Sequence, residues 1–353
     1  LLTDPNAGAM AAARALLTAL GALDADRITP HGRAIAALPL HPRLAHMLLL
    51  AGPKAAPVAA LLAERDPLKG APPDLALRMS ALADPRRFES EHPWQVLRPV
   101  IERLRQEVRR LERASTVNAD YSLGQMAALA YPDRIGLRRK GDAPRWVLSG
   151  GKGAAMDPGT PLASARMIVA TDLDGDTREA QIRQAAPLSD SELRDLYGPQ
   201  ITTQTLCEWS KRDGRVLTRK QDRFGALVLG DQAWPDAPTE AIAKAALDGL
   251  RLNGLYFTAS ARRFRARALL AGGSSPDWPD FTDQGLLASA EDWLLPYLGK
   301  CRTEADLRAL DLTEPLNSRL TWEQSRTLDH LVPAHFETPL GRKAAIDYDG
   351  DIP

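Results

Sequence analysis

The hydrophobic pattern of this 353-residue chain changes its spacing twice. From Pro42 to Ala130, apolar residues recur every three or four positions, which predicts a series of helices. After Tyr131-Pro132 the chain turns to short runs of strand-like composition, and from Thr239 the helical spacing returns. A chain of this length with both patterns is predicted to be an α+β protein of several domains.

Four domains are predicted from these changes. Residues 1–41 read as part of a winged helix, because a helix over 7–21, a short hairpin over 22–28 and a second helix beginning at Thr29-Pro30 follow one another. Residues 42–130 are predicted to form a helical bundle. Residues 131–230 contain several short strands at regular spacing, which is typical of a small β-barrel of the oligonucleotide-binding (OB) type. Residues 231–353 are predicted to be mostly helical, with strands at the end.

Several elements are specific enough to be tested. The longest predicted helix runs from about Pro93 to Ala114. Strands are predicted over 145–148, 167–170, 180–182, 205–210 and 215–220, with Asp-Gly turns at Gly175 and Gly214. Further helices are predicted over 241–252, 259–270, 283–298 and 321–331. Trp293 and Trp322 are expected to anchor the packing of the last two.

Composition narrows the setting in which the chain works. The formal net charge is zero, so affinity for nucleic acid has to come from local patches. The two cysteines lack metal-ligand spacing, which predicts a reducing, cytoplasmic location, and no apolar run is long enough for a membrane span. The chain has no initiator methionine and ends after a turn-like Asp349-Gly350-Asp351. Both ends predict a fragment of a longer protein.

Motifs for catalysis or metal binding are not found in the sequence. The string Ser149–Gly153 lacks the glycine spacing and the Lys-Ser/Thr ending of a phosphate-binding loop. The run from Asp172 to Asp176 places Arg183 where a calcium loop needs glutamate. The six histidines lack zinc-site spacing and read as capping or packing residues, and no nucleophile elbow is present. No catalytic residue, metal site or cofactor is therefore predicted for this chain.

Local positive charge is the remaining signal. Basic side chains with an interleaved aromatic suit a groove that follows a nucleic-acid backbone. The first candidate set lies at the start of the predicted barrel: Arg134, Arg138, Arg139, Lys140, Arg145, Trp146 and Lys152. The second lies on the long helix: Arg103, Arg109 and Arg110.

Two weaker clusters follow, and one alternative applies to every cluster. The third cluster lies near Trp209: Lys211, Arg212, Arg215, Arg219, Lys220 and Arg223. The fourth lies beside Phe264: Arg262, Arg263, Arg265 and Arg267. The alternative interpretation is a solvated, ion-paired face without a ligand.

Five stretches resemble a known family. Residues 29–48, which contain Leu38-Pro39-Leu40-His41-Pro42-Arg43, resemble the junction between winged helix and ratchet in DEAH-box helicases. The other stretches resemble the bacterial HrpB branch of that family. They are Ala127–Ile135 with Tyr131-Pro132-Asp133-Arg134, Glu291–Leu298, Pro333–Phe336 and Ile346–Tyr348. Together they span nearly the whole chain.

The resemblance implies two RecA-like motor domains before Leu1 that bind ATP and magnesium and move along single-stranded RNA. The region represented here would cap the motor and complete the channel for the strand. From the Arg-rich face of the helix over 93–114 and the cluster from Arg134 to Arg145, our own hypothesis is that this helix lies along the strand while the basic edge of the barrel guides it. Single-stranded DNA is an alternative ligand. Because the ATPase motifs are missing, this region is expected to be inactive alone. A second function remains open, in which the C-terminal helices recruit the helicase to a protein partner.

Overall fold

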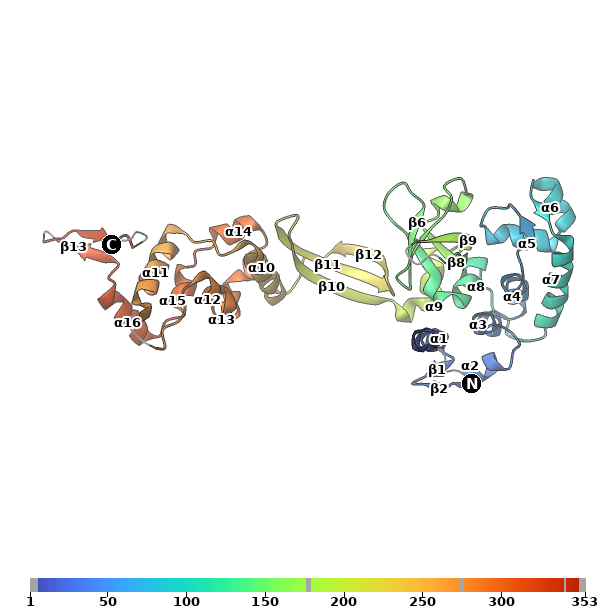
Figure 1. The fold of residues 1–353 in the computed structure, drawn as a ribbon, viewed down its shortest axis with the longest axis horizontal. Helices are drawn as coiled ribbons and strands as arrows, with labels where there is room; N and C mark the ends of the chain where they lie inside the picture. The colour runs from blue at the N-terminus through green and yellow to red at the C-terminus, as the bar shows by residue number, and fades with distance from the viewer. Residues whose placement is uncertain (1–5, 176–178, 274–275, 340, 349–353) are drawn as a thin grey trace. The chain divides into compact units, whose positions relative to one another are not determined.

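The computed structural model describes residues 6–175, 179–273, 276–339 and 341–348. The predicted turn at Asp349–Asp351 lies outside these residues, as does Asp176 in the predicted Asp-Gly turn. The fold is mixed α+β, as the sequence predicts (Figure 1). It divides into an N-terminal unit (1–203 and 222–230) and a C-terminal unit (204–221 and 231–353). No helix of the described residues has the length and apolar character needed to cross a membrane.

The N-terminal unit begins with the predicted helix, hairpin and helix. These are α1 (Ala7–Ala19), β1 (Leu23–Asp24), β2 (Arg27–Ile28) and α2 (Pro30–Ala36). The Thr29 hydroxyl accepts the Gly32 backbone N–H at 2.9 Å and so caps α2, as predicted. Gly32 is required by close packing, because a Cβ there would lie 2.1 Å from the Ala22 carbonyl oxygen.

The predicted helical bundle follows. It consists of α3 (Pro42–Ala51), α4 (Ala56–Ala63), α5 (Leu75–Ala83), α6 (Pro85–Glu91), α7 (Arg98–Leu111) and α8 (Leu123–Ala130), with a short 3₁₀ turn over Pro53–Ala55. The predicted helix from Pro93 to Ala114 was too long, since α7 begins only at Arg98. The residues before it form β4 (Gln95–Val96), which pairs with β3 (Leu68–Lys69). Pro99 suits the first turn of α7, where its missing N–H leaves no helical bond unmade.

Five strands then close into a barrel. They are β5 (Ile135–Arg138), β6 (Arg145–Leu148), β7 (Gly153–Ala155), β8 (Met167–Leu173) and β9 (Glu179–Pro187), in the order β5-β6-β7-β9-β8 and back to β5. The β7–β9 pair is parallel and the other pairs are antiparallel. A 3₁₀ turn lies over Pro161–Ser164, and α9 (Asp190–Tyr197) with a 3₁₀ turn over Gly198–Gln200 follows the barrel.

The bundle and the barrel share a hydrophobic core. Ile135, Met167 and Val169 of the barrel belong to the same buried cluster as the helices α3 to α8. Gly124 lets α8 approach β9, because a Cβ there would lie 2.2 Å from the Pro187 carbonyl oxygen. The two regions therefore pack as one body within the N-terminal unit.

The sheet β10 (Thr202–Ser210), β11 (Arg215–Phe224) and β12 (Leu227–Ala233) contributes segments to both units. The helices of the C-terminal unit are α10 (Thr239–Asn253), α11 (Ala259–Leu270), α12 (Asp283–Ala288), α13 (Ala290–Trp293), α14 (Glu304–Ala309), α15 (Thr313–Asn317) and α16 (Trp322–Leu331). Shorter 3₁₀ turns lie over Ala271–Gly273 and Leu295–Lys300. The unit ends with the antiparallel pair β13 (His335–Glu337) and β14 (Lys343–Ala345).

Two predictions for this unit were wrong. The continuous helix over 283–298 is divided into α12, α13 and the 3₁₀ turn. Pro296 accounts for the end of α13, because it cannot donate a helical hydrogen bond and its ring clashes with the preceding turn. Trp293 is buried as predicted, but Trp322 is 71% exposed, and its ring carries the Arg326 guanidinium at 4.8 Å. Trp322 stands at the first position of α16, on the side away from the core.

Candidate nucleic-acid interface

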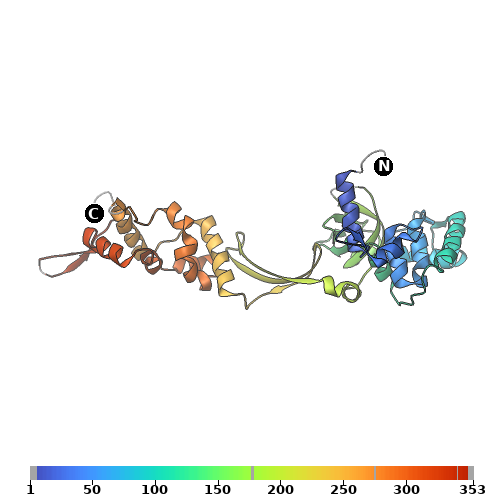
Figure 2. The ribbon, with the colours of Figure 1, turned by 90° about the horizontal axis from the view of Figure 1, so that it is seen from below.

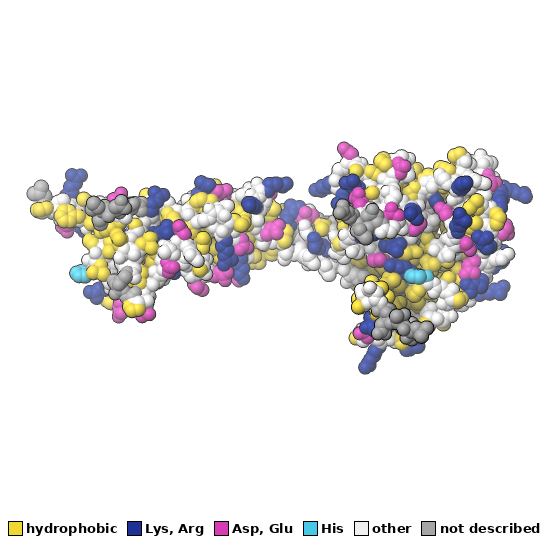
Figure 3. Space-filling model, viewed as in Figure 1, with side chains coloured by type: hydrophobic (Ala, Val, Ile, Leu, Met, Phe, Trp, Pro, Cys, Tyr) yellow, Lys and Arg dark blue, Asp and Glu magenta, His cyan; other side chains and the backbone are white. Residues whose placement is uncertain are grey.

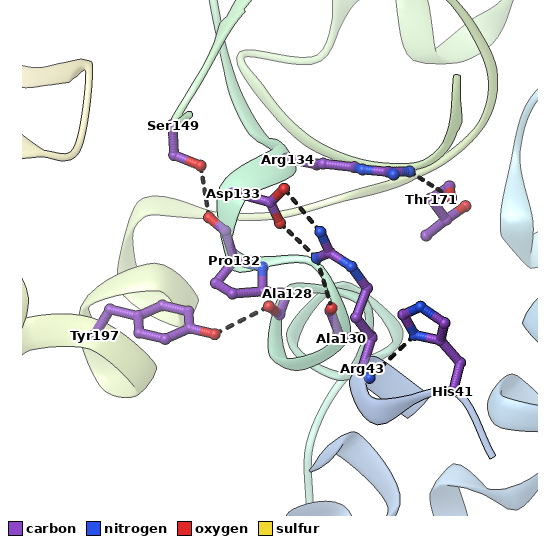
Figure 4. A network of polar contacts seen from close by, with 10 residues as sticks. All are labelled: His41, Arg43, Ala128, Ala130, Pro132, Asp133, Arg134, Ser149, Thr171 and Tyr197. Carbon is purple, nitrogen blue, oxygen red and sulfur yellow. Dashed lines mark hydrogen bonds and ion pairs between the residues drawn. The ribbon is translucent and has the colours of Figure 1, made fainter. Parts of the chain in front are cut away.

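Two of the motifs that carry the family resemblance meet in the N-terminal unit, although about ninety residues separate them. Arg43 of α3 binds Asp133, which follows α8, through both guanidinium nitrogens at 2.5 and 2.9 Å (Figure 4). One of these nitrogens also donates to the Ala130 carbonyl oxygen at 3.2 Å. We call these contacts the junction network, because they join the bundle to the start of the barrel.

Local sequence positions both halves of the junction network. The His41 side chain caps α3 by accepting the Arg43 backbone N–H at 3.3 Å, which confirms a capping role for this histidine. On the other side, Pro132 ends α8 and begins a 3₁₀ turn over Pro132–Arg134 that leads into β5. The Arg134 guanidinium donates to the Thr171 carbonyl oxygen of β8 at 3.3 Å (Figure 4).

Two further hydrogen bonds hold the same turn from the barrel and from α9. The Ser149 hydroxyl donates to the Pro132 carbonyl oxygen at 2.5 Å. The Tyr197 hydroxyl donates to the Ala128 carbonyl oxygen at 2.9 Å, and burial raises the pKa of this phenol so that it stays protonated. The backbone around Asp133 is thus fixed from three directions (Figure 4).

The charges of Arg43 and Asp133 in the junction network neutralise each other. Burial alone would raise the pKa of Asp133, but the Arg43 hydrogen bonds and charge outweigh it, and the pKa of this carboxyl is lowered. Burial and the positive charges of Arg43 and Arg134 lower the pKa of His41. The two guanidinium carbons lie 5.1 and 4.9 Å from the centroid of the Tyr131 ring. Asp133 forms its ion pair with Arg43, so the positive charge of Arg134 is not neutralised by a direct ion pair within the described residues.

A cavity of about 440 Å³ opens beside the junction network. It is lined by Pro39, Leu40, His41, Arg43, Leu44, Leu62, Ala63, Glu107, Tyr131 and Arg134. Figure 3 shows histidine and basic side chains beside a hydrophobic hollow on this unit. Glu107 does not cancel the charge of Arg134, because Arg110 binds its carboxylate at 2.5 Å. The cavity combines apolar side chains and the Tyr131 ring with charged groups, and the Arg134 guanidinium suits an anionic ligand with a flat apolar part.

The structure divides the predicted barrel cluster into two groups. Arg138, Arg139, Lys140 and Arg145 lie at the β5–β6 connection, which we call the β5–β6 loop (residues 138–145). Lys152 lies in the β6–β7 turn at the opposite end of β6, where the Gly150 N–H donates to the Asp133 carbonyl oxygen. Arg134 lies at this second end too. The two groups are separated by the length of the strands.

Within the β5–β6 loop, the side chains differ in their partners. Arg145 faces Glu179 at 3.3 Å, and Arg138 donates to the Asp142 carbonyl oxygen at 3.1 Å. Arg139 and Lys140 are exposed and form no ion pair within the described residues. A ligand anion can therefore bind Arg139 and Lys140 without breaking an existing ion pair.

The prediction that Trp146 belongs to the interface was wrong. Its side chain is 0% exposed, and its indole N–H donates to the Ala165 carbonyl oxygen at 3.2 Å inside the barrel. Arg145 points outward and Trp146 inward, because successive side chains of a strand face opposite sides. In the sequence, Trp146, Val147 and Leu148 form a continuous apolar run, so the barrel decided which of these side chains faces inward.

The arginines of α7 favour the ion-paired alternative. Arg103 lies 3.4 Å from Glu64 and Arg110 lies 2.5 Å from Glu107, whereas Arg109 is exposed without an ion pair among the described residues. Figures 1 and 2 place helices of the bundle between α7 and the barrel. The predicted groove, with α7 alongside the basic edge of the barrel, is therefore not one surface.

In each of the two remaining clusters, two arginines form ion pairs. Arg212 and Arg219 lie 3.1 and 2.8 Å from Asp213 and Asp231. Arg265 and Arg267 lie 3.2 and 2.7 Å from Asp283 and Asp329. These side chains stabilise their own surroundings, as the alternative interpretation expects.

The sequence patterns place His41, Arg43, Tyr131 and Asp133 in motifs but do not identify them as members of a site. No local pattern indicates that Arg43 and Asp133 contact each other, because the contact depends on how α3 and α8 pack.

Comparison with known proteins gives consistent matches. A family model described as "ATP-dependent helicase C-terminal" (HrpB_C) matches residues 293–353. The ATP-dependent RNA helicase HrpB of Escherichia coli K12 is 32% identical over 366 aligned residues, which cover all of this chain and 43% of that protein.

Two crystal structures, of the E. coli DExH-box NTPase HrpB and the E. coli DEAH/RHA helicase HrpB, match the whole chain. Their TM-scores are 0.55 and 0.52, with 30% and 29% identity, and the chain covers 43% and 44% of them.

These matches show that the chain is related to part of an ATP-dependent helicase. More specifically, it is related over its full length to the C-terminal region of HrpB-type helicases, which confirms the resemblance drawn from the sequence. The chain spans less than half the length of the relatives that it matches.

Proposed function

We propose that this chain is the accessory, nucleic-acid-guiding region of an ATP-dependent helicase and that its ligand is single-stranded RNA. The observation that carries the proposal is the β5–β6 loop, where Arg138, Arg139 and Lys140 follow one another at one end of a closed barrel. Arg139 and Lys140 are exposed and unpaired within the described residues, in contrast to Arg103 and Arg110 of α7.

The barrel and the first residues support the proposal through their topology. We assign the barrel to the OB type, since five strands close in the order β5-β6-β7-β9-β8 with one parallel pair. We assign α1, β1, β2 and α2 to the latter part of a winged helix. By the same relationship, RecA-like motor domains are the proposed partner, with ATP and magnesium bound there.

In this proposal the β5–β6 loop holds the sugar-phosphate backbone and does not read bases. Flexible cations that contact phosphates release counterions, so affinity depends strongly on salt and weakly on sequence. The cavity at the junction network offers a second contact, where Arg134 would receive a phosphate and the Tyr131 side of the cavity an apolar group. Lys152 lies at the same end of the barrel.

A titration of labelled oligouridine with this chain at several salt concentrations tests the proposal. The double variant Arg139→Glu/Lys140→Glu is expected to weaken binding and to reduce the slope of log affinity against log salt by about 1 to 2. The matched variant Arg103→Glu/Arg109→Glu reverses the same charge on α7 and is expected to have the smaller effect. Binding that does not depend on salt, or a larger loss from the α7 variant, contradicts the proposal.

A further inference from the structure

A second cavity lies in the C-terminal unit, and the proposed RNA contact does not use it. Its volume is about 310 Å³, and it lies between α11, the start of α15 and the base of the β13–β14 hairpin. The lining residues are Ser260, Arg263, Phe264, Arg267, Thr313, Ala334, His335, Ala345 and Ile346. The lining is mixed, with apolar side chains from Phe264, Ala334, Ala345 and Ile346 beside two arginines of α11 and other polar groups.

The two arginines differ in how far they are neutralised. Arg267 is buried and donates to the Val332 carbonyl oxygen and to Asp329, both at 2.7 Å. Arg263 is exposed, makes a 3.3 Å bond to the Ala259 carbonyl oxygen and forms no ion pair within the described part of the chain. A ligand anion would thus be bound by Arg263, while Arg267 holds α11 against the end of α16.

The hydroxyl groups of the cavity do not compete for that role. Ser260 and Thr313 donate to Asp311, at 3.2 and 2.8 Å, as does Thr258 at 2.7 Å. The Thr258 and Thr313 hydrogen bonds keep the pKa of Asp311 below its usual range. The Asp311 carboxylate is therefore negatively charged and its hydrogen bonds are made by these hydroxyl groups. An anionic ligand group is repelled from this side of the cavity and binds on the Arg263 side.

The hairpin beside the cavity has backbone groups free for a further strand. The Ile346 N–H donates to the Ala334 carbonyl oxygen, which makes Ala334–Ile346 a hydrogen-bonded pair. Since hydrogen-bonded and non-bonded pairs alternate, His335 directs its N–H and C=O groups to the outer edge of β13, and Ala345 directs its groups to the opposite edge, that of β14. Both residues line the cavity. An extended peptide can pair at such an edge and place a side chain into an adjacent pocket.

The surface around the cavity is apolar and positively charged. Leu270, Leu331 and Phe336 are 59%, 54% and 59% exposed, at the ends of α11 and α16 and on β13. Arg342 and Lys343 on the hairpin are exposed and form no ion pair within the described residues. Figure 3 shows hydrophobic side chains exposed on this part of the C-terminal unit. Exposed apolar groups beside unpaired cations are typical of a protein-interaction surface.

We propose that this cavity and the hairpin edge bind an extended acidic segment of a partner protein. One apolar side chain of the segment enters the cavity against Phe264, an adjacent carboxylate binds Arg263, and the backbone pairs with the hairpin. A pocket of this volume with Phe264 and Ile346 in its lining can take a single apolar side chain. The edge strand offers main-chain pairing that RNA cannot use. The proposal does not rest on RNA binding by the N-terminal unit.

Two synthetic peptide pools of equal length test the proposal by fluorescence anisotropy with the full 353-residue chain. One pool alternates Asp or Glu with Leu, Ile or Phe, and the other carries Lys at the acidic positions. The acidic pool is expected to bind saturably and the basic pool is not. Peptides of the acidic pool with alternate backbone nitrogens methylated are expected to lose binding, because they cannot pair with the hairpin edge.

Variants locate the binding. Arg263→Glu is expected to lower the affinity for the acidic pool by about tenfold or more, because a carboxylate of the peptide then faces a carboxylate of the protein. The matched control Arg262→Glu reverses the charge of an exposed neighbour that does not line the cavity, and it is expected to change affinity by less than about twofold. Ala345→Trp fills the cavity from an exposed position and is expected to abolish binding. Circular dichroism melting curves confirm that the variants fold.

Three results overturn the proposal. The first is saturable binding of neither pool or equal binding of both. The second is an equal effect of Arg262→Glu and Arg263→Glu. The third is competition by oligouridine that depends on Arg263, which would make the cavity a nucleic-acid site. A loss of RNA binding that depends only on Arg139 and Lys140 leaves this inference untouched and concerns the N-terminal unit.

Discussion

Acidification is expected to loosen the contact between α2 and α3, because a histidine pair holds it. The His31 Nε2 and His46 Nδ1 atoms lie 2.8 Å apart, and the rings meet edge to face with their centroids 5.0 Å apart. One nitrogen has to donate and the other to accept. Protonation of the accepting ring places two donors against each other, and burial opposes the added charge.

The size of the effect follows from the pKa of His46. Burial, with a smaller contribution from His31, lowers this pKa from 6.5 to about 4. The unfolded chain therefore binds the proton at a higher pH than the folded chain, and stability falls as the pH drops below about 6.5. Between pH 7 and pH 5 the loss is about 2 kcal/mol, and it continues toward pH 4. Burial also lowers the pKa of His31, which acts in the same direction.

Hydrogen exchange of the α3 amides at pH 5 and pH 7, corrected for intrinsic rates, measures the opening free energy. The variant His46→Asn keeps a polar group near the Nδ1 position but cannot titrate. The wild type is expected to lose about 2 kcal/mol relative to this variant between the two pH values. The same pH dependence in both proteins would refute the reasoning and assign the effect to another group, such as His41.

Three further predictions concern the N-terminal unit. Arg43→Met is expected to cost about 3 kcal/mol in urea denaturation because it leaves the Asp133 carboxylate partly buried without its partner, and Arg43→Met/Asp133→Leu should recover much of that loss. Trp146→Phe is expected to destabilise the barrel by about 1 to 3 kcal/mol through a lost hydrogen bond and lost packing. It should leave oligouridine affinity unchanged, and reduced affinity of the folded variant would restore Trp146 to the interface. Gly124→Ala is expected to lower thermal stability by about 1 to 3 kcal/mol, since its methyl group meets the Pro187 carbonyl oxygen, and an unchanged melting temperature would contradict that packing.

The sequence predicted the local elements well where capping residues, turn residues or strand-like composition mark them. The Thr29 cap, the strand from Arg145 to Leu148 and the positive φ of Gly214 lie where the pattern predicts them. Helix ends were less certain. The start of α7 depends on the pairing of β4 with a strand about 27 residues earlier, which a local pattern does not contain.

Short strings of the sequence, such as Tyr131-Pro132-Asp133-Arg134, also indicated the resemblance to HrpB-type helicases, and the similarity of the whole chain to E. coli HrpB supports it. Tertiary structure decided which charged side chains have partners. Arg103 and Arg139 look alike in the sequence, yet one faces Glu64 and the other faces solvent. Ion pairing and burial depend on contacts between distant segments, and no spacing rule along the chain encodes them. For the same reason only the folded protein brings Arg43 to Asp133, and only the fold encloses the cavity beside Arg263.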